Sequence, residues 1–427
     1  MEKDPAFERR INPVQVDEPS QELALEMVRG AKSRYEQHHH IKIEDDALVT
    51  AVKLASDYLT YRKLPDTAFD LIDLTCANAN TFTDCQVIAS SDIVKTLVEM
   101  TGINLMDVQV SMSERLNKVE NALLRQVIGQ DQAVSKIMER LMLAHGGLVR
   151  RDRPLGVFLF MGAPGSGKTL LAKMLAKYLF GDDKKMLRLD MGEYKEEVSV
   201  SRIIGSSPGY IGYQEGGKLT EFLKNNPFSI LLFDEVEKAH YRVTDVFLSL
   251  CGEGHITDGK GRKIDGRNTL VIMTSNIGSE ILAKGGVTLG FDWGNNQADS
   301  QFNYIQSVIR KQLPEFFRPE FVNRIDEIII FRSLERCDFE EISRLQVQKI
   351  SDRLAYFGTT LIVESQVYQL LAKEAVKMKS GARPLERLID EMIVLPLSKM
   401  RINHQLQNGD KIYCEVINDL IQMRKEI

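Results

Sequence analysis

The chain has 427 residues, a net charge of −5 at pH 7 and 43% hydrophobic residues. This balance is typical of a globular protein with several apolar cores, and it excludes a chain that is disordered throughout. The acidic excess disfavours a dedicated nucleic-acid binder, and no apolar run approaches the roughly 18 residues of a membrane span. The five cysteines are far apart and form no CxxC pair, so we expect a reduced intracellular protein without a disulfide framework or zinc site.

Residues 1–80 predict a helical domain. Ser20 is placed to cap the first of its helices. Apolar residues recur at helical spacing over residues 21–31, 47–59 and 67–74. Residues 81–125 are polar and mixed, with one helical stretch at 114–124, and we interpret them as a connector.

From about residue 126 the pattern changes, and short apolar runs alternate with amphipathic helices. The runs cover residues 157–161, 187–189, 230–233, 270–274 and 328–331. Such alternation predicts an α/β domain over residues 126–331, with a mostly parallel sheet flanked by helices on both faces. Residues 332–427 are mainly helical and end in an alternating strand near 412–416, which predicts a small C-terminal α+β domain.

A glycine-rich segment follows the first of these apolar runs and fits the pattern GxxxxGK[ST]. The glycines let the backbone fold around phosphates so that amide N–H groups point inward, and the helix that follows adds positive potential. Lys168 is expected to reach the β- and γ-phosphates, and Thr169 to bind Mg²⁺. The predicted nucleotide-binding residues are Gly162, Ala163, Pro164, Gly165, Ser166, Gly167, Lys168, Thr169 and Leu170.

Polar side chains end two further strands. The run 230–233 is followed by Asp234 and Glu235, and the strand would deliver Asp234 to the metal edge of the nucleotide site. Glu235 is then placed to polarise a water that attacks the γ-phosphate. Asn276 ends the run 270–274 and is a candidate to orient that water, although an asparagine at a strand end is more often a turn former.

Two arginines complete the set of candidate catalytic residues. Arg324 precedes the last strand of the predicted sheet, where it could act on the γ-phosphate of a neighbouring subunit or form an ion pair with Asp326. Arg383 stands just before a helix opened by Pro384, and it could contact the nucleotide from a lid.

These motifs in this order resemble an AAA+ ATPase module. Longer strings are similar to the second ring module of the Clp family of protein unfoldases, and they lie at residues 201–205, 208–213, 234–240, 258–262 and 321–326. The resemblance runs from about residue 126 to the C-terminus. It implies ATP and Mg²⁺ as cofactors, with Thr169 and Asp234 at the metal, and it adds Val127 and Ile128 to the nucleotide-binding residues.

Residues 1–80 are similar to the end of the first ring module in the same family. The resemblance therefore implies the second half of a two-ring Clp ATPase, without the amino-terminal domain and without the phosphate-loop core of the first module. A first-ring nucleotide site would then need a separate chain that carries the amino-terminal half.

Three loops are candidates for contact with polypeptides. Tyr210 and Ile211 match the central pore loop of the family ring, and an aromatic residue between glycines can hold any extended chain. Without the resemblance, the same residues are interpreted as a turn with a half-buried tyrosine. A second pore loop is expected near residues 254–264. The tripeptide Leu289, Gly290 and Phe291 is similar to the one with which ClpC-type and ClpA-type unfoldases bind the ClpP peptidase. Residues 298–304 just after it resemble cyanobacterial and plastid ClpC. The alternative is that the loop with the tripeptide packs on the module's own core.

The sequence thus predicts an ATP hydrolase that threads unfolded or tagged proteins through a homo- or hetero-hexameric ring into a ClpP-type peptidase. We expect it in a plastid stroma or a bacterial cytoplasm, because its first residues hold no apolar signal core. The first alternative is a regulatory or scaffold half-subunit that needs a separate amino-terminal Clp half and has little activity alone. A P-loop ATPase acting on nucleic-acid complexes, or a small-molecule kinase, fits less well.

Overall fold

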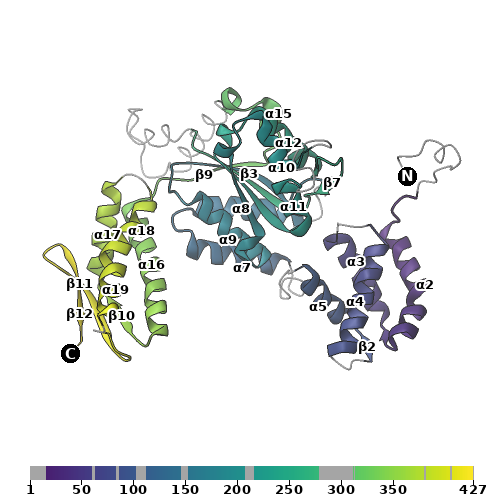
Figure 1. Ribbon diagram of the computed structural model, residues 1–427, viewed down its shortest axis with the longest axis horizontal. Coiled ribbons are helices and arrows are strands. Elements are labelled where there is room, and N and C mark those ends of the chain that lie inside the picture. The colour runs from purple at the N-terminus through teal and green to yellow at the C-terminus, as the bar shows by residue number, and fades with distance from the viewer. Residues whose placement is uncertain are drawn as a thin grey trace. The chain divides into compact units, whose positions relative to one another are not determined.

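The protein divides into two compact units, Met1–Ser111 and Met112–Ile427 (Figure 1). The computed structural model describes residues 16–59, 63–82, 86–101, 112–145, 152–206, 216–277, 311, 313–378, 381–403 and 406–426. Among these residues, no helix is long and apolar enough to span a membrane.

The first unit is helical, as its sequence pattern predicts. Its helices are α2 (Gln21–His39), α3 (Asp45–Tyr58), α4 (Asp66–Phe82) and α5 (Ser90–Thr101), and its two short strands, β1 (Lys42–Ile43) and β2 (Val87–Ile88), pair in parallel. The predicted cap is confirmed, because the Ser20 hydroxyl accepts a hydrogen bond from the Leu23 N–H at 3.3 Å. Apolar faces of all four helices meet in one core.

The segment predicted as a connector, residues 81–125, instead adds a helix to each unit. Helix α5 packs on α3 and α4 and buries Ile93, Val94 and Leu97 in the core of the first unit. Helix α7 (Met112–Gln126) packs on the second unit through Leu116 and Leu123. Both helices present an apolar stripe of helical period that is diluted by charged residues on the opposite face, which is why the segment looks polar on average.

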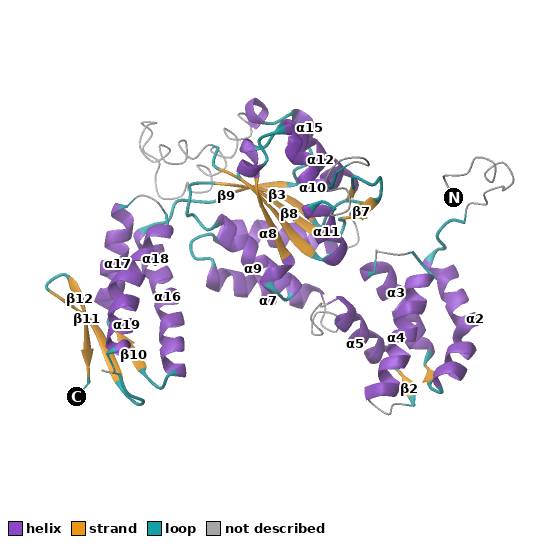
Figure 2. Ribbon diagram, viewed as in Figure 1, coloured by secondary structure: helices purple, strands orange, loops and turns teal. Residues whose placement is uncertain are grey.

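The second unit contains a five-stranded sheet in the order β4-β5-β8-β3-β9, with every pair parallel (Figure 2). The strands are β3 (Gly156–Met161), β4 (Met186–Asp190), β5 (Ser229–Asp234), β8 (Thr269–Ser275) and β9 (Glu327–Ile330). The predicted parallel sheet is therefore confirmed. Parallel strands end at the same edge of a sheet, so the segments that follow β3, β5 and β8 meet there.

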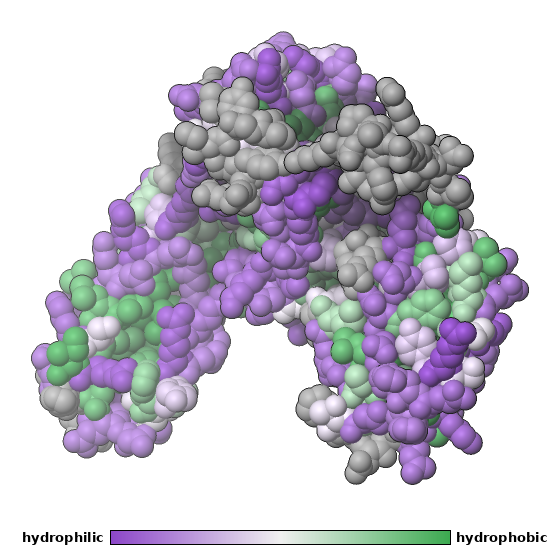
Figure 3. Space-filling view, turned by 45° about the vertical axis from the view of Figure 1, so that its right-hand side comes forward, coloured by the Kyte–Doolittle hydropathy of each residue, from purple (hydrophilic) through white to green (hydrophobic). Residues whose placement is uncertain are grey.

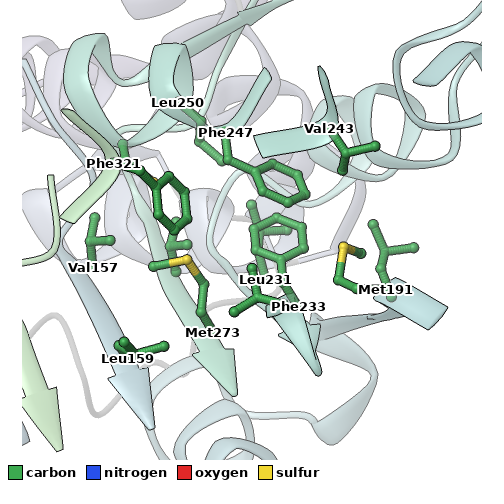
Figure 4. Packing of buried hydrophobic residues seen from close by; sticks show 14 of the residues in the cluster. Val157, Leu159, Met191, Leu231, Phe233, Val243, Phe247, Leu250, Met273 and Phe321 are labelled. Atoms are coloured by element: carbon green, nitrogen blue, oxygen red, sulfur yellow. The ribbon is translucent and has the colours of Figure 1, made fainter. Parts of the chain in front are cut away.

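Helices cover both faces of this sheet. Helices α7, α8 (Asp131–His145) and α9 (Lys168–Phe180) pack on the face that carries Phe158, Phe160 and Ile272. The other face carries Leu159, Phe233 and Met273, against the helices α10 (Val200–Ile204), α11 (Lys218–Asn225), α12 (Tyr241–Glu253) and α15 (Pro319–Val322). The rings of Phe233 and Phe247 stack there with centroids 3.9 Å apart (Figure 4).

A small domain follows the last strand of the sheet. It consists of α16 (Arg336–Tyr356), β10 (Thr360–Val363), α17 (Ser365–Lys377), α18 (Arg383–Ile389), a π-helical turn (Asp390–Val394), α19 (Leu395–Ile402), β11 (Lys411–Ile417) and β12 (Leu420–Lys425). Strand β11 pairs in parallel with β10 and antiparallel with β12. This domain is the small α+β domain that the sequence predicts, and it packs around its own core.

Candidate nucleotide site

The loop between β3 and α9 is shaped by three glycines in conformations that other residues rarely adopt. Gly162, Gly165 and Gly167 have φ angles of 148°, 75° and 104°. A Cβ at Gly162 would lie 2.7 Å from the carbonyl oxygen of Phe331, so the loop runs directly against the residue that follows β9. The first N–H groups of the 13-residue helix α9 have no partner within the helix, and groups of this kind suit an anion.

Lys168, the first residue of α9, is buried to 8% exposure under this loop. Its Nζ donates hydrogen bonds to the Gly162 carbonyl oxygen at 2.5 Å and to Asn276 Oδ1 at 3.1 Å. Burial lowers the pKa of this ammonium to about 8, while the charges of Asp234 and Glu237 act to raise it. A partly desolvated cation in this position is stabilised by the negative charge of a phosphate.

Asp234 ends strand β5 and is fixed from two sides. Arg188 on the neighbouring strand β4 donates to Asp234 Oδ2 from Nε at 3.0 Å and from Nη2 at 2.5 Å. The Thr274 hydroxyl on β8 donates to the other carboxylate oxygen, and the same hydroxyl oxygen accepts the Glu235 N–H at 3.0 Å. Thr274 therefore sets the positions of both acidic residues.

Glu235 has a left-handed backbone with φ of 57°, an uncommon conformation for a residue with a side chain. Its Oε1 accepts a hydrogen bond from Asn276 Nδ2 at 3.1 Å, and its Oε2 forms an ion pair with the Lys238 ammonium. The hydrogen bond to Glu235 raises the pKa of Lys238. Asn276 thus connects Lys168 on one side with Glu235 on the other, because it directly follows β8, which lies between β3 and β5.

These groups line a cavity of about 590 Å³ between the sheet and the small domain. Val127, Thr169 and Leu170, expected at the nucleotide, are part of its lining, whereas Gly162 and Ala163 are not. The predicted residues that line it are Val127, Ile128, Pro164, Gly165, Ser166, Gly167, Lys168, Thr169, Leu170, Asp234, Glu235, Asn276 and Arg383. The lining combines apolar side chains, which suit a nucleobase, with polar and charged groups, which suit phosphates.

The small domain touches the phosphate loop directly at the entry to α18. The Ala382 N–H donates to the Gly165 carbonyl oxygen at 3.0 Å, and a Cβ at Gly381 would lie 2.6 Å from the Pro164 carbonyl oxygen. Arg383, the first residue of α18, is exposed and lines the cavity. The structure thus places Arg383 beside the phosphate loop, while Pro384 occupies the second position of the helix.

Arg324 lies away from this cavity. Its side chain is exposed, and its guanidinium lies next to Gly252 near the end of α12. Asp326, the ion-pair partner considered for it, instead binds Arg140 at 2.9 Å and Arg153 at 3.8 Å. Among the described residues no ion pair or hydrogen bond of the Arg324 guanidinium is found.

Two of the three loops expected to contact polypeptides lie outside the described residues. These are the pore-loop residues Tyr210 and Ile211 and the tripeptide Leu289, Gly290 and Phe291. The expected second pore loop is described, and it forms a hairpin of β6 (His255–Thr257) and β7 (Lys263–Asp265). Its turn residue Gly259 donates its N–H to the Ile204 carbonyl oxygen at 3.0 Å.

Several site residues were not identified from the sequence. Leu334, Ile342 and Leu345 line the apolar wall from the small domain, and no local pattern separates them from ordinary core residues. Arg188 carried a signal, because a charged residue inside a short apolar strand indicates a specific partner. Lys238 carried another, since it stands three residues after Glu235.

Comparison with known proteins places this geometry in a class. The chain matches three family models: "AAA domain (Cdc48 subfamily)" over residues 153–328, "AAA lid domain" over residues 20–123, and "C-terminal, D2-small domain, of ClpB protein" over residues 334–414. The sheet order, the phosphate loop, the acidic strand end and the lid arginine all belong to the second unit. The protein is an AAA+ ATPase, a class of enzymes that hydrolyse ATP.

Individual relatives narrow the class to a family. The chain is similar to the "ATP-dependent Clp protease ATP-binding subunit ClpA homolog" of Pyropia yezoensis, with 36% identity over 98% of this chain and 59% of the relative. It is 35% identical to "Chaperone protein ClpC1, chloroplastic" of Arabidopsis thaliana, over 97% of this chain and 52% of the relative. The solved S. cerevisiae Hsp104-ADP complex matches with 38% identity and a TM-score of 0.81, over 98% of this chain and 72% of the other.

The chain therefore belongs to the Clp family of AAA+ ATPases and contains the second nucleotide-binding module of that family. It spans between half and two thirds of the length of the curated relatives named above.

Proposed function

We propose that this chain is a subunit of an ATP-driven protein unfoldase that hydrolyses ATP in the cavity described above. One observation carries the proposal: Asn276 joins Lys168 and Glu235 by hydrogen bonds of 3.1 Å each, in a cavity that also holds the lid residue Arg383. Three groups would then surround the same cavity: Lys168 to bind phosphate, Glu235 to act as base for the attacking water, and Arg383 of the lid. This is the arrangement that phosphoryl transfer to water requires.

The residues present fit a nucleotide with Mg²⁺. The Ser166 hydroxyl in the phosphate loop is buried and has no hydrogen-bond partner among the described residues, and an unpaired buried polar group of this kind suits a site completed by a ligand. Thr169 and Asp234 line the same cavity and offer the hard oxygen ligands that Mg²⁺ prefers. Bound Mg²⁺ would neutralise charge on the β- and γ-phosphates, and Asp234, held by Arg188 and Thr274, would orient it.

A ring assembly, homo- or hetero-hexameric, is part of the proposal. Arg324 is exposed and outside its own cavity, which is the arrangement expected of a finger that acts on a neighbour's nucleotide. Large apolar side chains also reach the surface of the small domain, visible as green areas on the lobe at the left of Figure 3. Tyr356 is 86% and Ile402 is 75% exposed, and exposed apolar groups of this size support contact with another subunit.

We assign Tyr210 and Ile211 to the grip on the substrate polypeptide. The segment that contains them starts after Ser206 and ends before Gly216, and both ends are anchored. Gly217 packs against the backbone of Ile203 and Ile204, and the β6–β7 hairpin bonds to Ile204 through Gly259. Movements of the sheet during the ATP cycle would therefore be transmitted to this loop.

Docking to a ClpP-type peptidase through Leu289, Gly290 and Phe291 completes the proposal, with unfolded or tagged proteins as substrates. The relatives favour a plastid stroma as the location, because they include a ClpA homolog from a red alga and a chloroplastic ClpC1. A bacterial cytoplasm is the alternative. A separate chain with the amino-terminal Clp half remains a proposed partner for the first unit.

The test is ATP-dependent unfolding of a tagged fluorescent reporter protein by the full chain, with Tyr210→Ala as the variant and Tyr213→Ala as the matched control. The proposal predicts that Tyr210→Ala loses reporter unfolding at least about tenfold while ATP turnover persists, because the aromatic grip is lost but the nucleotide site is intact. Equal unfolding by both variants would contradict the assignment of the pore loop. Adding a ClpP-type peptidase, with Phe291→Ala as a variant, then tests docking by degradation of the same reporter.

A further inference from the structure

A buried glutamine, Gln130, joins the phosphate loop to the hinge that leads into the small domain. It immediately precedes helix α8 and is only 3% exposed. Its Nε2 donates to the Ser166 carbonyl oxygen and to the Arg332 carbonyl oxygen, both at 3.0 Å. Its Oε1 accepts the Arg332 N–H at 3.1 Å. One carboxamide thus satisfies backbone groups of two segments that are 166 residues apart in the chain (332 − 166).

The hinge side of this connection continues into the first lid helix. Arg332 forms two parallel hydrogen bonds with Asp338, from Nη1 to Oδ2 and from Nη2 to Oδ1, each 2.7 Å long. Asp338 is buried in the first turn of α16 and also accepts the Glu335 N–H at 2.7 Å. Bidentate pairs of this kind fix orientation as well as distance, so Arg332 and the start of α16 move together.

The backbone just before Gln130 runs close to the Arg332–Asp338 pair. The preceding residue, Gly129, has a φ of 76°, and a Cβ there would lie 2.7 Å from Asp338 Oδ1 and 2.8 Å from Arg332 Nη2. The backbone before α8 therefore presses against the Arg332–Asp338 pair. We call Gln130, Arg332 and Asp338 the hinge clamp.

The phosphate loop is held at two consecutive carbonyls, one by Gln130 before α8 and the other by the small domain. Ser166 is held by Gln130 of the hinge clamp, and Gly165 is held by the Ala382 N–H at the entry to α18. A change in the angle between the sheet and the small domain acts on the Gly165 contact directly, and on the Ser166 contact through Arg332, which Gln130 also binds. The amide groups that would receive phosphates belong to the same loop.

We propose that Gln130 is a positioning residue that couples the shape of the phosphate loop to the angle of the small domain, through the hinge clamp. Nucleotide in the cavity fixes the phosphate loop, the Ser166 carbonyl fixes Gln130, and Gln130 fixes the backbone of Arg332 and with it α16. The inference rests on the proposed nucleotide site, because the signal begins with phosphate at the loop.

The experiment is amide hydrogen exchange of the full chain with and without ADP, together with the dissociation constant of ADP from equilibrium titration. The variant Gln130→Leu removes all three hydrogen bonds at similar volume. The variant Gln130→Glu keeps the acceptor for the Arg332 N–H and loses both donors, so it carries the test if the leucine variant does not fold. The matched control is Gln132→Leu, an exposed glutamine in the first turn of α8.

In the wild type and the control, ADP should slow exchange in the phosphate loop and in the hinge segment 331–338. In both Gln130 variants, saturating ADP should still protect the phosphate loop, while the response of the hinge segment falls at least about threefold and the dissociation constant rises about tenfold. A lower melting temperature with an unchanged hinge response and an ADP affinity within about twofold of wild type would overturn the inference and leave Gln130 a structural residue only. A wild type that binds no ADP would instead refute the proposed nucleotide site.

Discussion

The two parts of the molecule that resemble lids have related topologies but different surroundings. In the first unit a long helix, α2, leads into β1, and β1 pairs in parallel with a strand, β2, that follows two more helices. In the small domain α16 leads into β10, which pairs in parallel with β11 after several helices. The topology alone therefore does not create a nucleotide site, since the small domain adjoins a phosphate loop in its own unit and the described part of the first unit contains none.

The difference lies in a few contacts and in charge. Helix α18 begins with Arg383, next to the hydrogen bond between the Ala382 N–H and the Gly165 carbonyl oxygen. The first unit's α4 begins with an acidic residue, Asp66. A cation at the helix entry attracts phosphate, whereas a carboxylate repels it. Two features thus distinguish the small domain from the first unit. Its backbone contacts a phosphate loop, and the residue at its helix entry is positively rather than negatively charged.

Removing the proposed finger should have the largest effect on the working site. Arg324→Ala should lower ATP turnover by about a thousandfold, because a finger contributes charge stabilisation only in the transition state. The affinity for ADP should stay within about twofold of wild type, since the side chain lies outside its own cavity. Steady-state turnover and ADP titration measure the two quantities. The matched control is Arg318→Ala, an exposed arginine paired with Asp245, and equal loss in both variants would contradict the assignment.

Removing the phosphate-loop cation should weaken nucleotide binding itself. Lys168→Ala should raise the dissociation constant of ADP about a hundredfold, because a buried charge that pairs with phosphate is lost. Lys173→Ala, five residues later on α9 and paired with Asp183 on the surface, should change it less than about twofold. An ADP titration that gives the same constant for Lys168→Ala as for wild type would show that the nucleotide binds elsewhere.

A core substitution in the first unit should separate the two regions. Leu48 is fully buried in α3, so Leu48→Ala should destabilise the first unit by about 3 kcal/mol through lost burial and the cavity left behind. The neighbouring Val49 is 38% exposed, and Val49→Ala should cost less than about 1 kcal/mol. Thermal unfolding with and without ADP checks both. The ADP affinity of the second unit should not change, and a parallel loss of affinity would show that the two units act as one.

The sequence predicts most of the sheet because its information is local. All five strands were located from apolar runs, and the phosphate loop and Asp234 follow from residues adjacent in the chain. The remaining site residues depend on partners far away. Arg188 on β4 binds Asp234 on the neighbouring strand β5, and Thr274 on β8 hydrogen-bonds to both acidic residues. Leu334 reaches the cavity only through the position of the small domain. Predicting such contacts requires the sheet order, which a single sequence does not give.

The segment interpreted as a connector shows a second limit of prediction from sequence alone. Residues 81–125 look polar on average, yet Leu97 and Leu123 are fully buried because each lies on the apolar stripe of a helix. A mean over the segment hides a stripe that only helical spacing reveals. The other domain boundaries and the roles of Tyr210 and Phe291 stay predictions.

The most direct test of the central claim is ATP turnover per subunit measured against protein concentration, for the wild type and Glu235→Gln. Glu235 is the proposed base for the attacking water, and Arg324 would act on a neighbour's nucleotide, so activity should depend on both the side chain and the assembly. We predict that wild-type turnover per subunit rises steeply with concentration and that Glu235→Gln lowers it at least about a hundredfold while ADP still binds. Turnover near zero at every concentration would contradict the account of a self-sufficient ring and favour a half-subunit that needs a partner chain.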